Sequence, residues 1–407
     1  MCDEQGKEGE DRPESNSIAQ ALDARSDFPE ARREYERAAA LFLQSEGRLS
    51  QEAIVVQLQR AGMEARSYET GSLARARSIL AEEEPRIAGI ARPREDLPVW
   101  LASARGMIAL IANDAKTAAE QFQAASDRAR VLPDFDETAR LSFKQRLAFT
   151  CIRLGDGARA ERLFRELITD FTRAGGPENP GVLRVRLNLA QAFMIEGKHQ
   201  EAIEEASAIY PAYVARLGEE HELTMQLLTT RAQSEGSVGL WDDAVRDDLA
   251  VYRLAVRKQG PLSFFAVAAL SDAALAQCRA GRYGEGEPNA RQSFDASAKA
   301  FGARAGLTGG AAYTLASCWI GLGRLQEASK LLQNIDTQVV AQLVGSPDWF
   351  ANVELAQGEI AYRRGDYRAA RKYLDSAAPA FSRADAEPFQ KHALASLSAA
   401  IDKRLRR

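Results

Sequence analysis

The sequence has few of the residues that build metal sites. Its 407 residues include three histidines and four cysteines, and no two cysteines form a Cys-x-x-Cys pair. Structural zinc sites group such ligands at short spacings, so we expect no metal and no other cofactor. Cys151, Cys278 and Cys318 fall inside helical patterns, where a free thiol packs as a small apolar side chain. Reduced thiols in turn favour a cytoplasmic location.

Long apolar segments and an excess of basic residues are also missing. The most apolar stretches, 101–112 and 264–275, are interrupted by Arg105 and Asp272, and both fall short of the ~20 apolar residues that a membrane span requires. Lys and Arg number 53 against 57 Asp and Glu, which gives a net charge of -4. Proteins that bind a phosphate backbone without specificity carry a basic face. We therefore expect neither a membrane span nor direct nucleic-acid binding.

Catalytic motifs are absent as well. The chain has no glycine-rich phosphate loop ending in Lys-Ser or Lys-Thr, no His-Glu-x-x-His and no Gly-x-Ser-x-Gly. Paired acids, such as Glu204 with Glu205 and Asp242 with Asp243, lie on predicted helix surfaces, where carboxylates are ordinarily solvated. The sequence predicts no catalytic residue and no enzyme activity.

What the sequence does have is a period of 42 residues. Turn-forming residues recur at this interval eight times, at Gly71, Asn113, Gly155, Gly197, Gly239, Gly281, Gly323 and Gly365. Five residues after each turn comes a small residue, at Ala76, Ala118, Ala160, Ala202, Ala244, Gly286, Ala328 and Ala370. Glycine ends a helix readily, and small residues let two helices approach closely. The period therefore predicts a pair of packed helices in each repeat.

Stacked helix pairs bury a continuous core that no single pair could form. We predict an all-α, right-handed superhelical solenoid of about nine hairpins with a C-terminal capping helix. Residues 1–16 are expected to be a disordered acidic tail, 17–385 the repeat array and 386–407 the capping helix. The glycine- and proline-rich segment 174–181 is predicted to be a link between hairpins and not a domain boundary. Glu64 lies seven residues before the turn at Gly71, where the other repeats have glycine or alanine, so the repeat register is weakest there.

The repeats resemble a known family. The segment Gly365-Asp-Tyr-Arg-Ala-Ala, with the small residue Gly358 in the helix before it, looks like the tetratricopeptide repeat (TPR). The period of 42 residues is similar to the long variety found in kinesin light chains and bacterial signalling proteins. The resemblance covers residues 17–382. It implies a helical solenoid that binds other proteins, and it says little about which partner is bound.

In such a superhelix the first helices of the hairpins line the concave side. The turn register places a mixture of arginines, amides and a few aromatics on that side. This mixture suits an extended peptide whose backbone is held by amides and whose acidic residues meet Arg146 and Arg184. The predicted groove residues are Arg146, Phe149, Arg153, Arg184, Asn188, Gln191, Gln226, Thr230, Gln233, Asp272, Arg279, Tyr313, Thr314, Ser317, Asn352, Glu359 and Tyr362. We expect tryptophans such as Trp241 and Trp319 to serve in packing, whereas Trp100, near the start of a first helix, fits either packing or recognition.

Three functions fit these features. The first is a non-catalytic scaffold that binds a partner protein or an extended peptide, an acidic one being the specific form considered, in its concave groove. The second is the C-terminal sensor or interaction region of a larger bacterial signalling protein, either a Ser/Thr kinase or a winged-helix transcriptional regulator. The third, ranked last because the N-terminal region shows no effector module, is an intracellular receptor for a signalling peptide.

Overall fold

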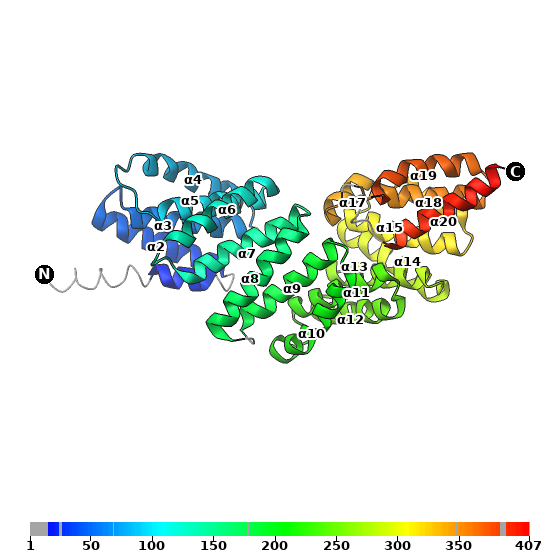
Figure 1. Ribbon diagram of the computed structural model, residues 1–407, viewed down its shortest axis with the longest axis horizontal. Helices are drawn as coiled ribbons and strands as arrows, with labels where there is room; N and C mark the ends of the chain where they lie inside the picture. The colour runs from blue at the N-terminus through cyan, green and yellow to red at the C-terminus, as the bar shows by residue number, and fades with distance from the viewer. Residues whose placement is uncertain are drawn as a thin grey trace. The chain divides into compact units, whose positions relative to one another are not determined.

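The structure is a computed structural model that describes residues 15–23, 27–67, 69–176, 179–346, 348–382 and 388–406. Contacts divide the chain into an N-terminal unit, residues 1–173, and a C-terminal unit, residues 174–407. The boundary falls at the start of segment 174–181, which the repeat pattern predicted to be an ordinary link; residues 177 and 178 lie outside the described part. Both units are built from helices (Figure 1).

The described secondary structure is entirely helical, beginning with a short helix at residues 15–23. The helices that follow as far as the end of the N-terminal unit are α2 (Phe28–Glu46), α3 (Gln51–Arg66), α4 (Ser72–Ala88), α5 (Leu97–Ile111), α6 (Ala115–Val131), α7 (Glu137–Arg153) and α8 (Gly157–Gly175). Those of the C-terminal unit are α9 (Pro180–Ile195), α10 (His199–Leu217), α11 (Glu222–Val238), α12 (Trp241–Gln259), α13 (Phe264–Arg279), α14 (Tyr283–Phe301), α15 (Gly306–Gly321), α16 (Leu325–Gln333), α17 (Thr337–Val344), α18 (Phe350–Arg363), α19 (Tyr367–Phe381) and α20 (Pro388–Leu405).

Within each unit consecutive helices pack on one another, and neighbouring hairpins are in contact. In the C-terminal unit α9 contacts α10, α11 contacts α12 and α13 contacts α14. The first helices of neighbouring hairpins also touch, as α11 does α13 and α13 does α15. The predicted all-α stack of helix hairpins is confirmed. None of the helices in the described ranges is both long and apolar enough to cross a membrane.

The turn residues behave as the period predicts. The seven turn glycines have φ between 73° and 85°, and Asn113 has φ of 63°. This left-handed conformation costs glycine little and asparagine less than most residues, which is why the hairpin turns select them. The alanines five residues after the turns are almost completely buried where the two helices of each hairpin meet.

Glu64 shows how an acid can replace a small residue at this interface. Its side chain is fully buried and accepts hydrogen bonds from Arg32 (Nε to Oε1, 2.5 Å) and Arg75 (Nε to Oε2, 2.9 Å). Burial alone would raise the pKa of this carboxyl, but the two guanidinium groups outweigh burial and lower the pKa. Two arginines thus hold the acid ionised in the position where register was weakest.

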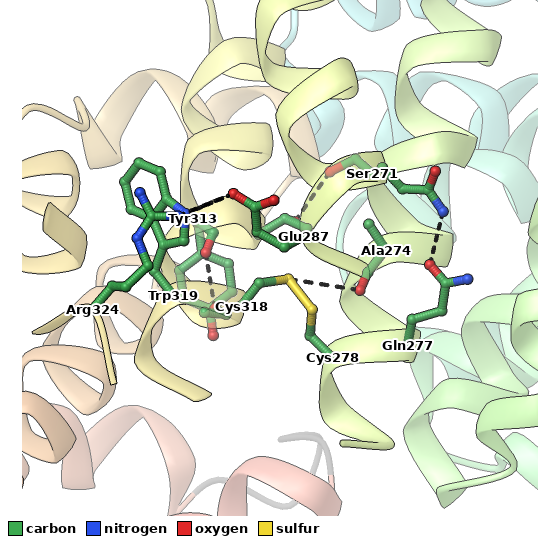
Figure 2. Close-up of a disulfide and its surroundings, with 12 residues drawn as sticks. Ser271, Ala274, Gln277, Cys278, Glu287, Tyr313, Cys318, Trp319 and Arg324 are labelled. Carbon is green, nitrogen blue, oxygen red and sulfur yellow. Dashed lines mark hydrogen bonds and ion pairs between the residues drawn. A yellow bond between two sulfur atoms is a disulfide. The ribbon is translucent and has the colours of Figure 1, made fainter. Parts of the chain in front are cut away.

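A disulfide joins two neighbouring hairpins of the C-terminal unit (Figure 2). It links Cys278 at the end of α13 to Cys318 in α15, with 5.3 Å between the Cα atoms, and both side chains are buried. The expectation that these cysteines are free thiols is wrong, because α13 and α15 lie side by side and bring residues about one repeat apart into contact. Cys151 is a buried free thiol, as predicted.

The disulfide explains why one repeat has glycine where its neighbours have alanine. A Cβ atom added to Gly286 would lie 2.4 Å from Cys278 Sγ and 3.0 Å from the Ala274 carbonyl oxygen. We expect Gly286→Ala to lower the free energy of unfolding by about 1–3 kcal/mol, since a disulfide sulfur and a helix backbone cannot easily move aside. Urea denaturation followed by circular dichroism measures this change.

Gly284 in the same helix provides the matched control, because nothing lies within 4 Å of a Cβ atom built there. Gly284→Ala is expected to be neutral or slightly stabilising, as helix propensity requires. Equal urea midpoints for the two variants would show that the space beside Cys278 is not limiting.

Candidate functional site

The predicted groove residues all lie on first helices of the hairpins. Three belong to α7 in the N-terminal unit, and the rest belong to α9, α11, α13, α15 and α18 in the C-terminal unit. The structure therefore offers two separate sets of side chains, one in each unit. Their exposure and their contacts differ from one residue to the next.

In the N-terminal unit the predicted arginines already have partners within the chain. Arg146 is half-buried and donates a hydrogen bond to Ser103 Oγ on α5 (3.2 Å). Burial, together with repulsion from Arg66, lowers the pKa of Arg146 to about 10, while Asp23 in the first described helix opposes the shift. Arg153 donates to Asn113 Oδ1 at 2.6 Å. This set is occupied by internal contacts, apart from the exposed ring of Phe149.

In the C-terminal unit α9 and α11 present polar side chains to solvent. Arg184 and Gln233 are exposed, and Asn188, Gln191 and Gln226 are half-buried. Arginine and amide side chains together can pair with carboxylates and with peptide N–H and C=O groups. We call these five residues the α9–α11 polar row.

Thr230 does not belong to this row, contrary to the prediction. It is buried, with 3% of its surface exposed. Its hydroxyl donates to the Gln226 carbonyl oxygen of its own helix (3.0 Å). A hydroxyl that bonds back into its helix in this way is not available to a ligand.

Arg279 takes part in an aromatic site near the hairpin turns. Gly239 has φ of 85° and directs the chain so that Trp241 begins α12. The Arg279 guanidinium, at the end of α13, lies 5.8 Å from the Trp241 ring centre and 4.6 Å from the ring centre of Phe389 in α20. The Trp241 and Phe389 rings meet edge to face with 5.3 Å between centres. Cation–π contacts of this kind are stabilising.

Tyr313, an aromatic residue of the predicted groove, packs against another ring of the chain. The Tyr313 ring lies 5.5 Å from that of Trp349 in a T-shaped contact. Trp319 donates from Nε1 to Glu287 Oε1 (3.1 Å) and lies under the Arg324 guanidinium (Figure 2). Trp100 packs against Phe135 and Phe143. Trp241 and Trp319 pack within the chain, as predicted, and Trp100, which fitted either role, packs as well. Trp241 also meets Arg279, a predicted groove residue.

A cluster of buried acids between α11, α12 and α13 was not foreseen. Asp247 accepts from Arg231 Nε (2.5 Å) and Arg246 Nε (3.1 Å), but the Oδ1 atom of its neighbour Asp248 has no hydrogen-bond partner. Burial, with repulsion from Asp272, Asp247 and Glu235, raises the pKa of Asp248 well above its usual value.

Burial also raises the pKa of Glu235, to about 7, with repulsion from Asp247 adding to the effect. The sequence feature that marks the cluster is the pair Asp247-Asp248 in the middle of a second helix, and both of these acids are buried. Within the described ranges, no group of three or more His, Cys, Asp and Glu side chains is arranged to hold a metal ion.

Residues 137–213 match the tetratricopeptide repeat family. The apo form of RapI superposes with a TM-score of 0.70 at 10% identity, covering 90% of this chain and 96% of that one. The apo quorum sensor NprR from B. thuringiensis gives 0.69 at 12% identity, covering 90% and 99%.

A Rap protein complexed with Competence and Sporulation Factor gives a TM-score of 0.60 at 12% identity, covering 97% of this chain and 99% of that one. Among curated proteins no sequence matches this chain. At such identities the likeness is one of fold. Residues 137–213 are thus tetratricopeptide repeats, within a chain whose fold is that of the Rap and NprR proteins.

Proposed function

We propose that this chain is a non-catalytic peptide-binding protein that holds a peptide, or an extended segment of a partner protein, along the first helices of its C-terminal unit. The observation that carries the proposal is the α9–α11 polar row, where an exposed arginine and four amides are offered by two adjacent first helices. Amides bind the polar groups of an extended backbone, and Arg184 supplies charge for an acidic residue.

The solved structures support the peptide-receptor alternative more than the general scaffold. One protein of this fold is a quorum sensor, and another was solved with Competence and Sporulation Factor bound. The receptor function ranked last on sequence is therefore the form of the proposal that we favour. A cytoplasmic location is also part of the proposal, although the disulfide removes one support for it, because disulfides persist mainly in oxidising compartments.

Panning a library of random 12-residue peptides against the intact chain tests the proposal. Selected peptides are expected to bind with micromolar dissociation constants, typical of a modest peptide interface. Arg184→Glu should weaken them at least ~10-fold, because losing an arginine–carboxylate pair and adding a repulsive charge costs more than ~1.4 kcal/mol. Fluorescence polarisation with labelled peptides measures the loss.

Arg253→Glu is the matched control, since Arg253 is an exposed arginine on the second helix α12. It makes the same change of charge away from the polar row. Peptides that respond equally to both variants would indicate general electrostatic attraction. A library that yields no binder, or binders indifferent to Arg184, would refute the proposed surface.

A further inference from the structure

Helix α20 makes two separate sets of contacts within the C-terminal unit. Leu394, Leu397 and Ile401 pack on α18 and α19, and Arg371 of α19 donates to Ser398 Oγ (3.3 Å). These residues cover the apolar face of the last hairpin, which is the task of a capping helix. The first turn of α20 instead reaches hairpins far earlier in the chain, and α20 lies against α11 as well as α18 (Figure 1).

The contacts of this first turn are those of a ligand in a recognition site. The Phe389 ring meets the Trp241 ring edge to face, and the Arg279 guanidinium lies over both rings. The next residue, Gln390, donates from Nε2 to Asn352 Oδ1 on α18 (2.9 Å). Arg279 and Asn352 are side chains that the repeat register assigns to the groove. An aromatic ring followed by an amide thus contacts groove positions on α13 and α18, together with the turn residue Trp241 on α12.

Capping the last hairpin does not require this arrangement. Phe389 is outside the apolar clusters that α20 forms with α18 and α19. The first turn is also the part of a helix that opens most readily, because its N–H groups have no partners within the helix. It can therefore leave the site while Leu394, Leu397 and Ile401 keep the rest of α20 in place.

We propose that Trp241, Arg279 and Asn352 form a binding site for a peptide that carries an aromatic residue followed by Gln or Asn, and that Phe389 and Gln390 of α20 occupy this site in the free chain. A partner peptide of that chemistry displaces the first turn of α20. The inference deepens the proposed function and rests on its premise that the first helices bind peptides. It adds both a sequence preference and an internal competitor.

The test uses the full chain and a labelled peptide of sequence Pro-Phe-Gln-Lys-His-Ala-Leu, which copies residues 388–394. We expect the Phe389→Ala chain to bind this peptide at least ~10-fold more tightly than wild type, because affinity is reduced by the fraction of sites already filled. Adding Arg279→Ala to the Phe389→Ala chain should abolish the gain. A peptide with Ala in place of Phe should bind neither chain.

Equal affinity of the Phe389→Ala and wild-type chains, or absence of binding to both, overturns the inference. If the Phe389→Ala chain loses helical circular-dichroism signal, the Gln390→Ala chain provides the test. A gain in peptide affinity of about 3- to 5-fold, which corresponds to one hydrogen bond, supports the site, and no gain overturns it. Library peptides that depend on Arg184 but ignore Phe389→Ala leave the proposed function standing without this site. Binding of the α20 peptide alone leaves the site standing without the polar row.

Discussion

Reducing the Cys278–Cys318 disulfide is expected to lower the free energy of unfolding of the C-terminal unit by about 2–4 kcal/mol. The bond closes a loop of 40 residues, so it restricts the unfolded chain strongly. It also ties α13 to α15, and in a repeat array stability depends on such contacts between neighbours. Urea unfolding with and without a phosphine reductant, followed by circular dichroism, measures the difference.

The double variant Cys278→Ser with Cys318→Ser is the control, because its unfolding should not respond to reductant and should match that of the reduced wild type. Alkylation of the unfolded, unreduced protein should spare Cys278 and Cys318 in mass spectra and modify Cys151. Alkylation of all three before reduction would contradict the disulfide. An unchanged urea midpoint on reduction would show that the bond contributes nothing to stability.

The hairpin stack could be predicted from sequence because its determinants are local. A turn needs a residue that accepts positive φ, and the helix crossing needs a small residue. Both residue types therefore recur once in every repeat, as Gly239 and Ala244 do. The disulfide was missed, although its spacing carried a signal. Side chains 43 residues apart bond repeatedly across neighbouring first helices, as Arg146 does with Ser103 and Ser271 with Thr314. Cysteines separated by 40 residues were therefore candidates for contact.

The hairpin whose turn lies at Gly323 departs from the regular repeat. Its second helix is broken into α16 and α17, and Asp336 caps the start of α17 by accepting from Gln338 N (3.2 Å). Helix α17 packs against α15, where a Cβ atom at Gly306 would lie 2.8 Å from the Val339 carbonyl oxygen. The glycines of α15 thus leave room for a displaced helix. Glycine content alone does not predict that a displaced helix packs there.

The candidate sites were predictable only in part. Helical spacing places Arg184 and Asn188 on a first helix, but it cannot say that Thr230, on the next first helix, turns inward to bond its own backbone. The Phe389 contact with Trp241 depends on how far the later hairpins curve back toward the earlier ones, which is a property of the assembled unit. The periodic sequence pattern does not predict such contacts.

Asp248→Asn is expected to raise the free energy of unfolding by about 1–3 kcal/mol at pH 8, and this gain should shrink as the pH falls toward 3.8, the ordinary pKa of an aspartate. The Asp248 carboxyl is buried, one of its oxygens lacks a partner, and Asp247, Asp272 and Glu235 all oppose its ionisation. Folding raises the pKa of this carboxyl above its ordinary value of 3.8, so the native state binds more protons than the unfolded state once the pH exceeds that value, and the cost of burying the acid grows as the pH rises. Asparagine does not titrate and removes this pH-dependent cost.

The same cluster predicts how wild-type stability depends on pH. Folding raises the pKa of Glu235 from 4.5 to about 7, so the native state binds more protons than the unfolded state between these values. Its contribution is therefore complete below pH 4.5 and is lost as the pH rises through about 7, with a total of about 2–3 kcal/mol. Urea midpoints from pH 5 to pH 8 should fall for wild type and fall less for Asp248→Asn.

Asp295→Asn supplies the matched control, because Asp295 is exposed on α14 in the same unit. It should follow the wild-type curve at every pH. A lower stability of Asp248→Asn than of wild type at pH 8 would mean that the ionised carboxyl has a favourable partner, and the cluster would then be a structural ion-pair network. A gain at pH 8 that shrinks steadily as the pH falls toward 4 would show that the fold carries these acids at a cost, as binding and regulatory surfaces commonly do.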